Sequence, residues 1–328
     1  IKSMHNLLSS EIEVVNIGSA GTVFRFGLAY WSAREGITKI LTGDDQLLAR
    51  PIYPLINALI DLGADLTLLA NGSWRIRGKK LTGGSIKIDS SISSQFESAL
   101  LLIEPLMSSK LKIENISKGV STPYVKMTKI ICKNSFNWPP EYDWSNSWIW
   151  IARACITKEE ILLKGLSDIS IQGDIICAQW AKIFGFKLTN IDEGILVRSD
   201  QRDFDIINLN FISCPDLVQV AVALAILSKI KFSCSGLETL AFKETDRFKA
   251  LIDSLLLLGI EVDDIESNRS FSFDSSSWEP VNDTLNVSSL GDHRMSFFWA
   301  LIGLRQAISI QDRETVSKSY PNFWEQWD

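Results

Sequence analysis

One pattern recurs along the chain: an amphipathic helix, a glycine, and two strands joined by a turn. Its copies lie at residues 50–78, 172–199 and 243–274. The glycines that end the three helices are Gly63, Gly185 and Gly259, and Asn71-Gly72 supplies the turn in the first copy. Helices and strands that alternate in a repeated unit favour an α/β protein built from such units. We therefore predict an α/β fold assembled from repeats.

The chain divides into two parts that share this pattern. Further helices are predicted from apolar periodicity at residues 21–33, 93–107 and 215–229. Residues 134–148, NSFNWPPEYDWSNSW, contain a Pro-Pro pair and turn formers that interrupt the periodicity, as in a linker or hinge. The alternative is a long loop within one domain. We predict two similar domains, residues 1–141 and 142–328, which the length of 328 residues also favours.

The composition excludes several classes of protein. A net charge of −6 argues against a surface that binds nucleic acid, so local cations are better suited to small anionic metabolites. Five widely spaced cysteines without a C-x-x-C pair, and two histidines without an H-E-x-x-H pattern, indicate neither a disulfide framework nor a zinc site. The apolar run at residues 218–227 is too short to span a membrane, and no signal peptide is evident. These features favour a cytoplasmic protein.

Polar and charged side chains gather where the predicted helices begin. The stretch SLGDHRMSFFWALIGL, residues 289–304, places His293 and Arg294 in the first turn after an Asp292 N-cap, where the helix dipole disfavours cations. Such a turn is favourable if an anion binds there, because free backbone N–H groups and both cations attract negative charge. The alternative is a surface histidine and arginine without a binding role.

The stretch AFKETDRFKAL carries a dense group of charges. Lys243 and Arg247 are predicted on one helix face at i, i+4, and a solvated charged face is the alternative. Asp216 follows a proline and either caps an apolar helix or has a chemical role. Other element boundaries carry hydroxyl, amide and cationic groups: Ser19, Thr22, Arg25, Arg50, Ser93, Ser94, Gln95 and Lys318. Together they predict a cleft between two domains that binds phosphates or carboxylates.

Five of these stretches resemble motifs of one enzyme family. SAGTVFRF, SSQFESALL, KETDRFKAL, DHRMSFF and SKSYPNFWEQ occur in the order and at the spacings of the 5-enolpyruvylshikimate-3-phosphate (EPSP) synthases, or 3-phosphoshikimate 1-carboxyvinyltransferases. Shorter stretches, among them VSTPYVKM, IQGD and CPD, fill the gaps between them. The resemblance covers essentially the whole chain.

The resemblance implies a fold, a reaction and a set of partners. The fold is an inside-out α/β barrel: two similar domains of repeated βαβαββ units with a cleft between them. The reaction transfers the enolpyruvyl group of phosphoenolpyruvate to the 5-hydroxyl of shikimate 3-phosphate and releases phosphate, in aromatic amino-acid synthesis. The partners are these two small anions, with no metal or organic cofactor, no nucleic acid and no membrane. The protein is expected to be a cytoplasmic monomer.

The resemblance also implies roles for particular residues. Those expected to contact shikimate 3-phosphate are Ser93, Ser94, Gln95, Ser121, Tyr124, Asp216, Thr239 and Lys243. Those expected to contact phosphoenolpyruvate are Ser19, Gly21, Arg50, Gln95, Arg247, Arg294 and Lys318. Asp216 is expected to accept the proton of the 5-hydroxyl, and Glu244 to handle the proton on the methylene carbon. His293 is expected to contact these residues without touching the substrates itself.

The sequence departs from the family pattern at several points. Ser19 and Thr239 stand where the family usually has asparagine, and TPY replaces the commoner KPY or RPY. The chain opens IKSMHNLL without the family's N-terminal P-G-S-K-S-x-x-x-R motif, whose lysine and arginine touch both substrates. We therefore expect the first domain to be N-terminally incomplete, and the 328 residues by themselves to be inactive or nearly so.

Two other functions stay open at this point. UDP-N-acetylglucosamine enolpyruvyl transferase shares the fold and phosphoenolpyruvate, but it typically carries a cysteine in the loop before its Arg-Pro pair, and residues 43–51 contain none. The second alternative is an inactive protein that binds small anions. Phosphate release from the two substrates separates all three functions.

Overall fold

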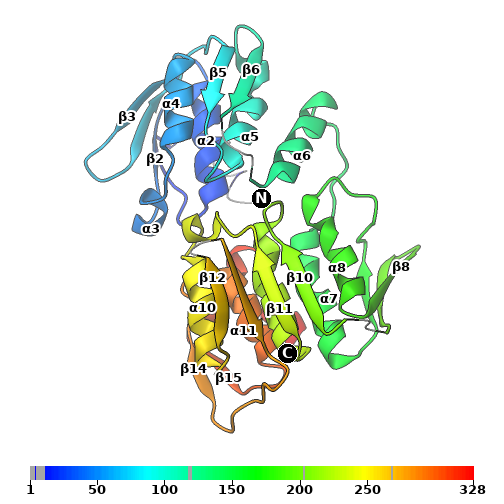
Figure 1. Cartoon of the computed structure of the whole chain (residues 1–328). Helices are drawn as coiled ribbons and strands as arrows, with labels where there is room; N and C mark the ends of the chain where they lie inside the picture. The colour runs from blue at the N-terminus through cyan, green and yellow to red at the C-terminus, as the bar shows by residue number, and fades with distance from the viewer. Residues whose placement is uncertain (1–3, 5–11, 117–119, 202–203, 267–268) are drawn as a thin grey trace. The chain divides into compact units, whose positions relative to one another are not determined.

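The computed structural model of the chain describes residues 4, 12–116, 120–201, 204–266 and 269–328 (Figure 1). The chain forms two compact units, Ile1–Trp138 and Pro139–Asp328, called unit 1 and unit 2 below. The predicted domain boundary between residues 141 and 142 stays a prediction. The opening of the predicted first domain, residues 1–3 and 5–11, lies outside the described residues.

Unit 1 alternates between strands and helices. In chain order its elements are β1 (Val14–Asn16), α2 (Gly21–Ser32), β2 (Thr38–Thr42), α3 (Asp45–Leu48), α4 (Tyr53–Asp61), β3 (Asp65–Leu68), β4 (Trp74–Arg77), β5 (Gly84–Ile88), α5 (Gln95–Ile103), the 3₁₀ helix η1 (Glu104–Leu106), β6 (Leu111–Asn115) and α6 (Thr122–Lys133). The strands form two sheets, of order β1-β2-β4-β3 and β5-β6. Helix α5 packs against α2, α4 and α6, so α5 lies in the interior of this unit.

Unit 2 has the same alternation. In chain order its elements are α7 (Trp144–Thr157), β7 (Ile161–Lys164), η2 (Gly173–Ile176), α8 (Cys177–Ile183), β8 (Phe186–Ile191), β9 (Gly194–Ser199), β10 (Ile206–Asn210), η3 (Pro215–Leu217), α9 (Val218–Leu227), β11 (Lys231–Ser235), η4 (Leu240–Phe242), α10 (Arg247–Leu257), β12 (Val262–Glu266), β13 (Ser270–Asp274), β14 (Leu285–Val287), α11 (His293–Ile302), β15 (Ile308–Ile310), η5 (Arg313–Lys318) and α12 (Phe323–Trp327). Its sheets have the orders β7-β9-β8, β10-β11-β13-β12 and β14-β15.

The two four-stranded sheets have the same construction. In unit 1, β1 runs parallel to β2, and β4 pairs antiparallel with both β2 and β3. In unit 2, β10, β11, β13 and β12 repeat this order and these directions. Each sheet is a βαβαββ unit, because one helix joins the parallel strands and another leads into the hairpin. The predicted α/β fold of repeated units is confirmed.

The other sheets are partial versions of this unit. The strands β5 and β6 are parallel with α5 between them, and β14 and β15 are parallel with α11 between them. The three-stranded sheet of unit 2 contains β7, β9 and β8, which correspond to β11, β13 and β12. Among the described residues, no strand precedes α7 in the place that β10 takes before α9.

The three predicted copies of helix, glycine, strand, turn and strand are confirmed as α4-β3-β4, α8-β8-β9 and α10-β12-β13. The glycine after each helix has a positive φ: Gly63, Gly185 and Gly259. Glycine adopts this left-handed conformation without a steric cost, which is why each helix ends there. The other predicted helices are found as α2, as α5 with η1, and as η3 with α9.

The predicted linker at residues 134–148 is wrong over its last part, residues 144–148. Helix α7 begins at Trp144 because Asp143 caps it, with its carboxylate accepting a hydrogen bond from the Ser145 N–H (2.9 Å). Trp144 and Trp148 then lie on one helix face and are buried. The Pro-Pro pair lies in the preceding segment, which contains neither helix nor strand.

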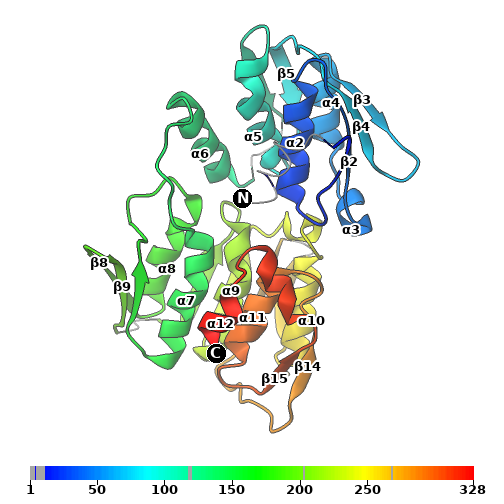
Figure 2. The same cartoon turned by 180° about the vertical axis from the view of Figure 1, so that it is seen from behind.

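The core of unit 2 is built around α9. Every residue from Val218 to Ile226 is buried, so this helix is covered on all sides rather than along one stripe. It packs against α7 and α11, and Figure 2 shows these helices together. Trp148 of α7 is fully buried, its indole N–H donates to the Leu217 carbonyl (3.2 Å), and its ring lies edge-on to Trp180.

The apolar helix α9 has 10 residues, about half of what spans a bilayer. Across the described part of the chain, no helix has both the length and the apolar character needed to cross a membrane.

We expect Trp148→Ala to lower the free energy of unfolding by about 3–5 kcal/mol, because it removes a fully buried ring and leaves a cavity beside α9. Urea unfolding followed by circular dichroism measures the change. Ile169→Ala is the matched control in the same unit. This side chain is 83% exposed, so its loss should change the free energy by less than about 0.5 kcal/mol. Equal effects of the two substitutions would contradict the packing of α7.

Candidate active site

The topology brings the charged helix starts of unit 2 together in pairs. Segment η3-α9 follows β10 and η4-α10 follows β11, and these two strands are parallel. In the same way, α11 follows β14 and η5 follows its parallel partner β15. Parallel strands end at the same edge of a sheet, so the segments that follow them begin at that edge. Six predicted site residues lie on these segments: Asp216, Lys243, Glu244, Arg247, Arg294 and Lys318.

Arg247 is the centre of a charged cluster in unit 2. It is the first residue of α10 and is 1% exposed. Its Nη1 donates to Asp216 Oδ1 (2.7 Å) and its Nη2 to Glu244 Oε2 (3.0 Å). Its Nε and Nη2 form a bidentate pair with Asp292, at 2.7 and 3.0 Å. Three carboxylates from three segments therefore hold one guanidinium.

Two lysines extend the cluster. Lys243 Nζ donates to Asp216 Oδ1 (3.1 Å), and Lys318 Nζ lies 3.6 Å from Glu244 Oε1. Each of these carboxylates therefore bridges Arg247 and a lysine. Both lysine side chains are 26% exposed and Asp216 is 29% exposed, so the cluster opens to solvent through these groups.

The start of α11 adds buried groups to the cluster. Asp292 is the N-cap, is 0% exposed, and accepts a hydrogen bond from the Arg294 N–H (2.9 Å). The Arg294 guanidinium donates from Nη1 to the Ser145 carbonyl (3.2 Å) and lies 5.7 Å from the centre of the Phe297 ring. Arg294 and His293 are both buried. The alternative of a surface histidine and arginine is therefore wrong.

The protonation of the cluster follows from this geometry. Burial by itself would raise the pKa of Asp216. Three neighbouring cations outweigh burial and hold this pKa well below its ordinary value: Lys243, Arg247 and Arg294. Burial by itself would lower the pKa of Arg247, but three carboxylates raise it above its ordinary value: Asp292, Glu244 and Asp216. Asp216 and Arg247 are therefore both charged at neutral pH.

Two sequence predictions about this cluster are wrong in detail. Lys243 and Arg247 do not share a helix face, because Asp246 caps α10 and the backbone of Lys243 is extended. The two cations meet instead at Asp216. Asp216 is not a helix cap: neither η3 nor α9, which lie wholly within the described residues, has a side-chain cap. The burial of Arg247 also excludes a merely solvated charged face.

Thr239 precedes η4, the 3₁₀ turn that leads to Lys243. It is 4% exposed, and its hydroxyl has no hydrogen-bond partner within the part of the chain that the structure describes. Buried hydroxyls in proteins are nearly always paired. The Thr239 hydroxyl is therefore a buried polar group that the described residues leave unpaired.

In unit 1, the polar starts of α2 and α5 meet. Arg25 Nη1 donates to Gln95 Oε1 (2.7 Å), and Gln95 Nε2 donates to Thr22 Oγ1 (3.0 Å). Arg25 is 8% exposed, and its guanidinium lies 5.5 Å from the centre of the Phe96 ring. A cation and an amide are thus held beside the first turn of α2.

Arg50 reaches the same helix start. A side-chain carbon at Gly21 would lie 2.9 Å from Arg50 Nη1 and 3.4 Å from Arg25 Nη1, so glycine leaves room for both guanidiniums. The same three residues line a small cavity. Two arginines and the N–H groups of a helix start form a second place in the chain that suits an anion.

The remaining predicted residues of unit 1 lie at the starts of α5, α6 and α2. Ser93 and Ser94 precede α5, and Ser121 precedes α6 with a left-handed backbone (φ 53°). The parallel strands β5 and β6 lead into these helices, so both starts lie at one edge of the pair. Tyr124 lies in the first turn of α6, and Ser19 lies in the turn before α2.

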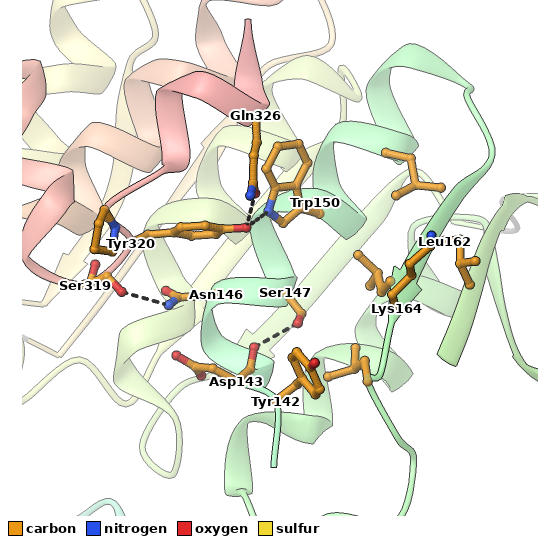
Figure 3. A pocket seen from close by; sticks show the side chains of 14 residues that line it. Tyr142, Asp143, Asn146, Ser147, Trp150, Leu162, Lys164, Ser319, Tyr320 and Gln326 are labelled. Carbon is orange, nitrogen blue, oxygen red and sulfur yellow. Dashed lines mark hydrogen bonds between the residues drawn. The ribbon is translucent and has the colours of Figure 1, made fainter. Parts of the chain in front are cut away.

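A cavity of about 680 Å³ in unit 2 is of a different kind (Figure 3). Its walls come from α7, β7 and residues 319–326 and include none of the predicted site residues. Trp150 Nε1 donates to the Tyr320 hydroxyl (3.2 Å), which donates in turn to Gln326 Oε1 (2.6 Å). The lining is mainly aromatic and aliphatic, so this cavity lacks the clustered cations that surround Arg247.

The role of Asp292 is missed by the sequence interpretation. In the sequence, Asp292 is indistinguishable from an ordinary N-cap, because nothing in DHRM shows that the carboxylate also meets Arg247 from another helix. Arg25 is expected from the sequence among the groups that suit an anion, and its spacing of four residues from Gly21 places both on one face of α2.

Comparison with known proteins supports one family along the whole chain. The family model described as EPSP synthase (3-phosphoshikimate 1-carboxyvinyltransferase) matches residues 1–135 and 133–327. The 3-phosphoshikimate 1-carboxyvinyltransferase of Bacteroides fragilis strain YCH46 is 32% identical over 351 residues, which cover 98% of this chain and 84% of the relative. That of Methanothermobacter thermautotrophicus is 29% identical, with coverage of 96% and 78%.

Solved structures share the fold. An EPSP synthase of Acinetobacter baumannii superposes with a TM-score of 0.69 at 19% sequence identity, and covers 96% of this chain and 78% of that one. The enolpyruvyl transferase NikO of Streptomyces tendae has a TM-score of 0.64 at 13% identity, with coverage of 92% and 74%. The fold is thus that of the enolpyruvyl transferases. Since the family model and the 32% identical relative both span the chain, the chain belongs to the EPSP synthase (3-phosphoshikimate 1-carboxyvinyltransferase) family.

Proposed function

We propose that the chain transfers the enolpyruvyl group of phosphoenolpyruvate to the 5-hydroxyl of shikimate 3-phosphate and releases phosphate. The observation that carries the proposal is the cluster around Arg247, in which two partly accessible carboxylates lie among several cations. The reaction joins two anions, so it needs cations that bind both and acid–base groups that move protons. Membership of the EPSP synthase family supports the same reaction.

In this proposal, guanidinium and ammonium groups bind phosphoenolpyruvate. The assigned residues are Ser19, Gly21, Arg50, Gln95, Arg247, Arg294 and Lys318. Arginine suits this role because its planar fork of donors matches phosphate and carboxylate oxygens. Arg25 assists by its hydrogen bond to Gln95, which orients the amide.

Hydroxyl groups at helix starts bind shikimate 3-phosphate in the same proposal. The assigned residues are Ser93, Ser94, Gln95, Ser121, Tyr124, Asp216, Thr239 and Lys243. The serines offer hydroxyl and backbone N–H donors to the phosphate. The buried hydroxyl of Thr239 supports its assignment, because a substrate hydroxyl would supply the partner that the described residues do not.

Two carboxylates move the protons. Asp216 accepts the proton of the 5-hydroxyl as that oxygen attacks the central carbon of phosphoenolpyruvate. Glu244 delivers a proton to the methylene carbon, which gives a tetrahedral ketal that still carries phosphate. Phosphate then leaves with the proton that Asp216 accepted, and the methyl group returns a proton to Glu244, which forms the carbon–carbon double bond of the enol ether product. Nearby cations stabilise the charge that develops in both steps.

The substrates also activate the base. Asp216 shares its Oδ1 between Lys243 and Arg247, which keep its pKa low and make it a weak base. A phosphate or carboxylate that binds these cations competes with Asp216 for the same N–H donors. The pKa of Asp216 then rises toward its ordinary value, so its proton affinity increases when the substrates are bound.

The cellular setting belongs to the same proposal. We infer a cytoplasmic monomer of two α/β repeat domains, residues 1–141 and 142–328, that needs no metal or organic cofactor. The five cysteines are free thiols, in keeping with a reducing compartment. Light scattering after size-exclusion chromatography measures the mass in solution and tests the monomer.

Phosphate release tests the proposed reaction. The full-length gene product, of measured intact mass, is mixed with shikimate 3-phosphate and phosphoenolpyruvate, and phosphate is measured over time. We expect release only when both substrates are present. Release with UDP-N-acetylglucosamine in place of shikimate 3-phosphate would favour the sibling transferase. Binding of phosphoenolpyruvate without any release would favour an inactive anion-binding protein.

We expect Glu244→Gln to lower kcat by about 10²-fold or more, because glutamine keeps the shape but cannot exchange a proton with the methylene carbon. The KM for each substrate should change by only a small factor. Steady-state phosphate release measures both. Glu279→Gln is the control, since this exposed carboxylate pairs with Lys229 in the same unit. Normal turnover by Glu244→Gln would show that Glu244 is only part of the ion-pair network.

His293 is a neutral group in this proposal rather than a proton donor. Burial lowers its pKa, and the neighbouring Arg294 lowers it further, to about 4. Its ring lies edge-on to Phe297, with 6.2 Å between ring centres. We therefore assign His293 to the support of the first turn of α11.

The low pKa of His293 predicts a pH dependence of stability. The unfolded chain binds this proton near the ordinary value of 6.5 and the folded chain only near 4. Between these pH values the unfolded state holds more protons, so stability rises with pH across this window. The low pKa of His293 should lower the free energy of unfolding by about 3 kcal/mol at pH 4 relative to pH 7, at about 1.4 kcal/mol per pKa unit.

Urea unfolding of the wild type and His293→Gln at pH 4, 5, 6 and 7 isolates this effect. Other titrating groups contribute to both proteins, so the difference between the two curves reports His293. We expect the wild type to lose more stability than the variant as the pH falls from about 6.5 to 4. If the free energies of unfolding of the two proteins changed with pH by the same amount, the burial of a neutral imidazole would be contradicted.

A further inference from the structure

We propose that Asp292 is a positioning residue that orients the Arg247 guanidinium toward phosphoenolpyruvate. The inference rests on the proposed function, and it concerns a residue for which the sequence predicts only a helix cap. It differs from capping, because a cap needs one side-chain oxygen at the start of α11 and Asp292 uses both of its oxygens on Arg247 as well.

The contacts of Asp292 fix one edge of the guanidinium. Its Oδ2 accepts from Nε of Arg247 at 2.7 Å, and its Oδ1 accepts from Nη2 at 3.0 Å. Asp292 is 0% exposed and Arg247 1% exposed, so water does not compete for this pair. A bidentate pair between two planar groups leaves the guanidinium no freedom to rotate about its own axis.

Because Asp292 holds one edge of the Arg247 guanidinium, it also sets the directions of the N–H donors on the opposite edge. The donors of a guanidinium lie in one plane, so holding Nε and Nη2 sets the directions of the remaining N–H groups. Those groups meet Asp216 at 2.7 Å and Glu244 at 3.0 Å. In the proposed function these are the two carboxylates that exchange protons with the substrates. Asp292 thus acts on the reaction through Arg247.

The same carboxylate also links the two buried arginines. Its Oδ1 accepts from the Arg294 N–H at 2.9 Å as well as from Arg247. Loss of the carboxylate would therefore disturb both the cap and the ion pair, and a test must separate them. Serine is a good N-cap but cannot form a bidentate pair, so Asp292→Ser retains the cap and removes the fixed edge.

Steady-state kinetics of Asp292→Ser on the full-length enzyme test the proposal. We expect kcat/KM for phosphoenolpyruvate to fall about 10²-fold, while KM for shikimate 3-phosphate stays within about 3-fold. Asp312→Ser is the matched control. The carboxylate of Asp312 accepts from Ser289 and Gly291 just before α11, so this variant disturbs the same region without the ion pair. An equal fall in the control would overturn the proposal.

A double-mutant cycle with Arg247→Ala tests the route of the effect. If Asp292 acts through Arg247, adding Asp292→Ser to Arg247→Ala should change kcat/KM by less than about 3-fold. A further fall of about 10-fold or more would overturn the proposal. Asp292→Ser alone leaves a buried cation short of a partner and can fail to fold, which circular dichroism detects. The double variant removes both partners, so its comparison with Arg247→Ala still decides the question.

The activity of the wild type distinguishes a failure of this inference from a failure of the proposed function. If the wild type is active and Asp292→Ser has the same kcat/KM, the positioning role alone is overturned. A wild type that releases no phosphate would overturn the proposed reaction, and calorimetric binding of phosphoenolpyruvate to both proteins then replaces kinetics. If Asp292→Ser binds phosphoenolpyruvate about 10²-fold more weakly than the wild type, the positioning role is supported. If the two proteins bind it equally, or if the wild type does not bind it, the role is overturned.

Discussion

The burial of one guanidinium, that of Arg247, is the constraint on which the site of unit 2 depends. A buried cation is unfavourable unless hydrogen bonds and opposite charges replace the water that it loses. Four of its N–H contacts go to the carboxylates of Asp216, Glu244 and Asp292. These belong to η3, to the segment before α10 and to the cap of α11. The electrostatic requirement of one side chain therefore fixes three segments relative to each other.

The repeated unit explains why these segments meet at all. In a βαβαββ unit the parallel strands end at one edge, and each is followed by a segment that begins there. The pairs β10-β11 and β14-β15 thus deliver four such segments within unit 2. In unit 1, the pairs β1-β2 and β5-β6 do the same for the starts of α2, α3, α5 and α6, three of which carry Gly21, Gln95 and Ser121. Groups that suit an anion arise from the repeat, because every copy contributes a helix N-terminus.

Local features of this fold are predictable from the sequence, and long-range pairings are not. Helix periodicity, the glycines that end helices and the Asp292 cap depend on residues a few positions apart, so their predictions hold. The start of α7 cannot be recognised from the sequence, because its tryptophans follow two prolines and a run of turn formers. The meeting of Lys243 with Asp216 joins residues 27 positions apart, and no local period encodes it. The family resemblance names Asp216 and Lys243 as site residues, but it does not show that they bind each other.

The balance of charge in the cluster links stability to the proposed chemistry. Its cations are Lys243, Arg247, Arg294 and Lys318, and its carboxylates are Asp216, Glu244 and Asp292. The cluster thus carries one more positive than negative charge. In the proposed function, two anionic substrates bind at this cluster and reverse the balance, since each brings a phosphate group. The excess of negative charge then favours proton uptake by a carboxylate of the cluster. In the proposed function, addition to phosphoenolpyruvate requires such a proton at the methylene carbon, so binding of the substrates would itself prepare the acid that the reaction uses.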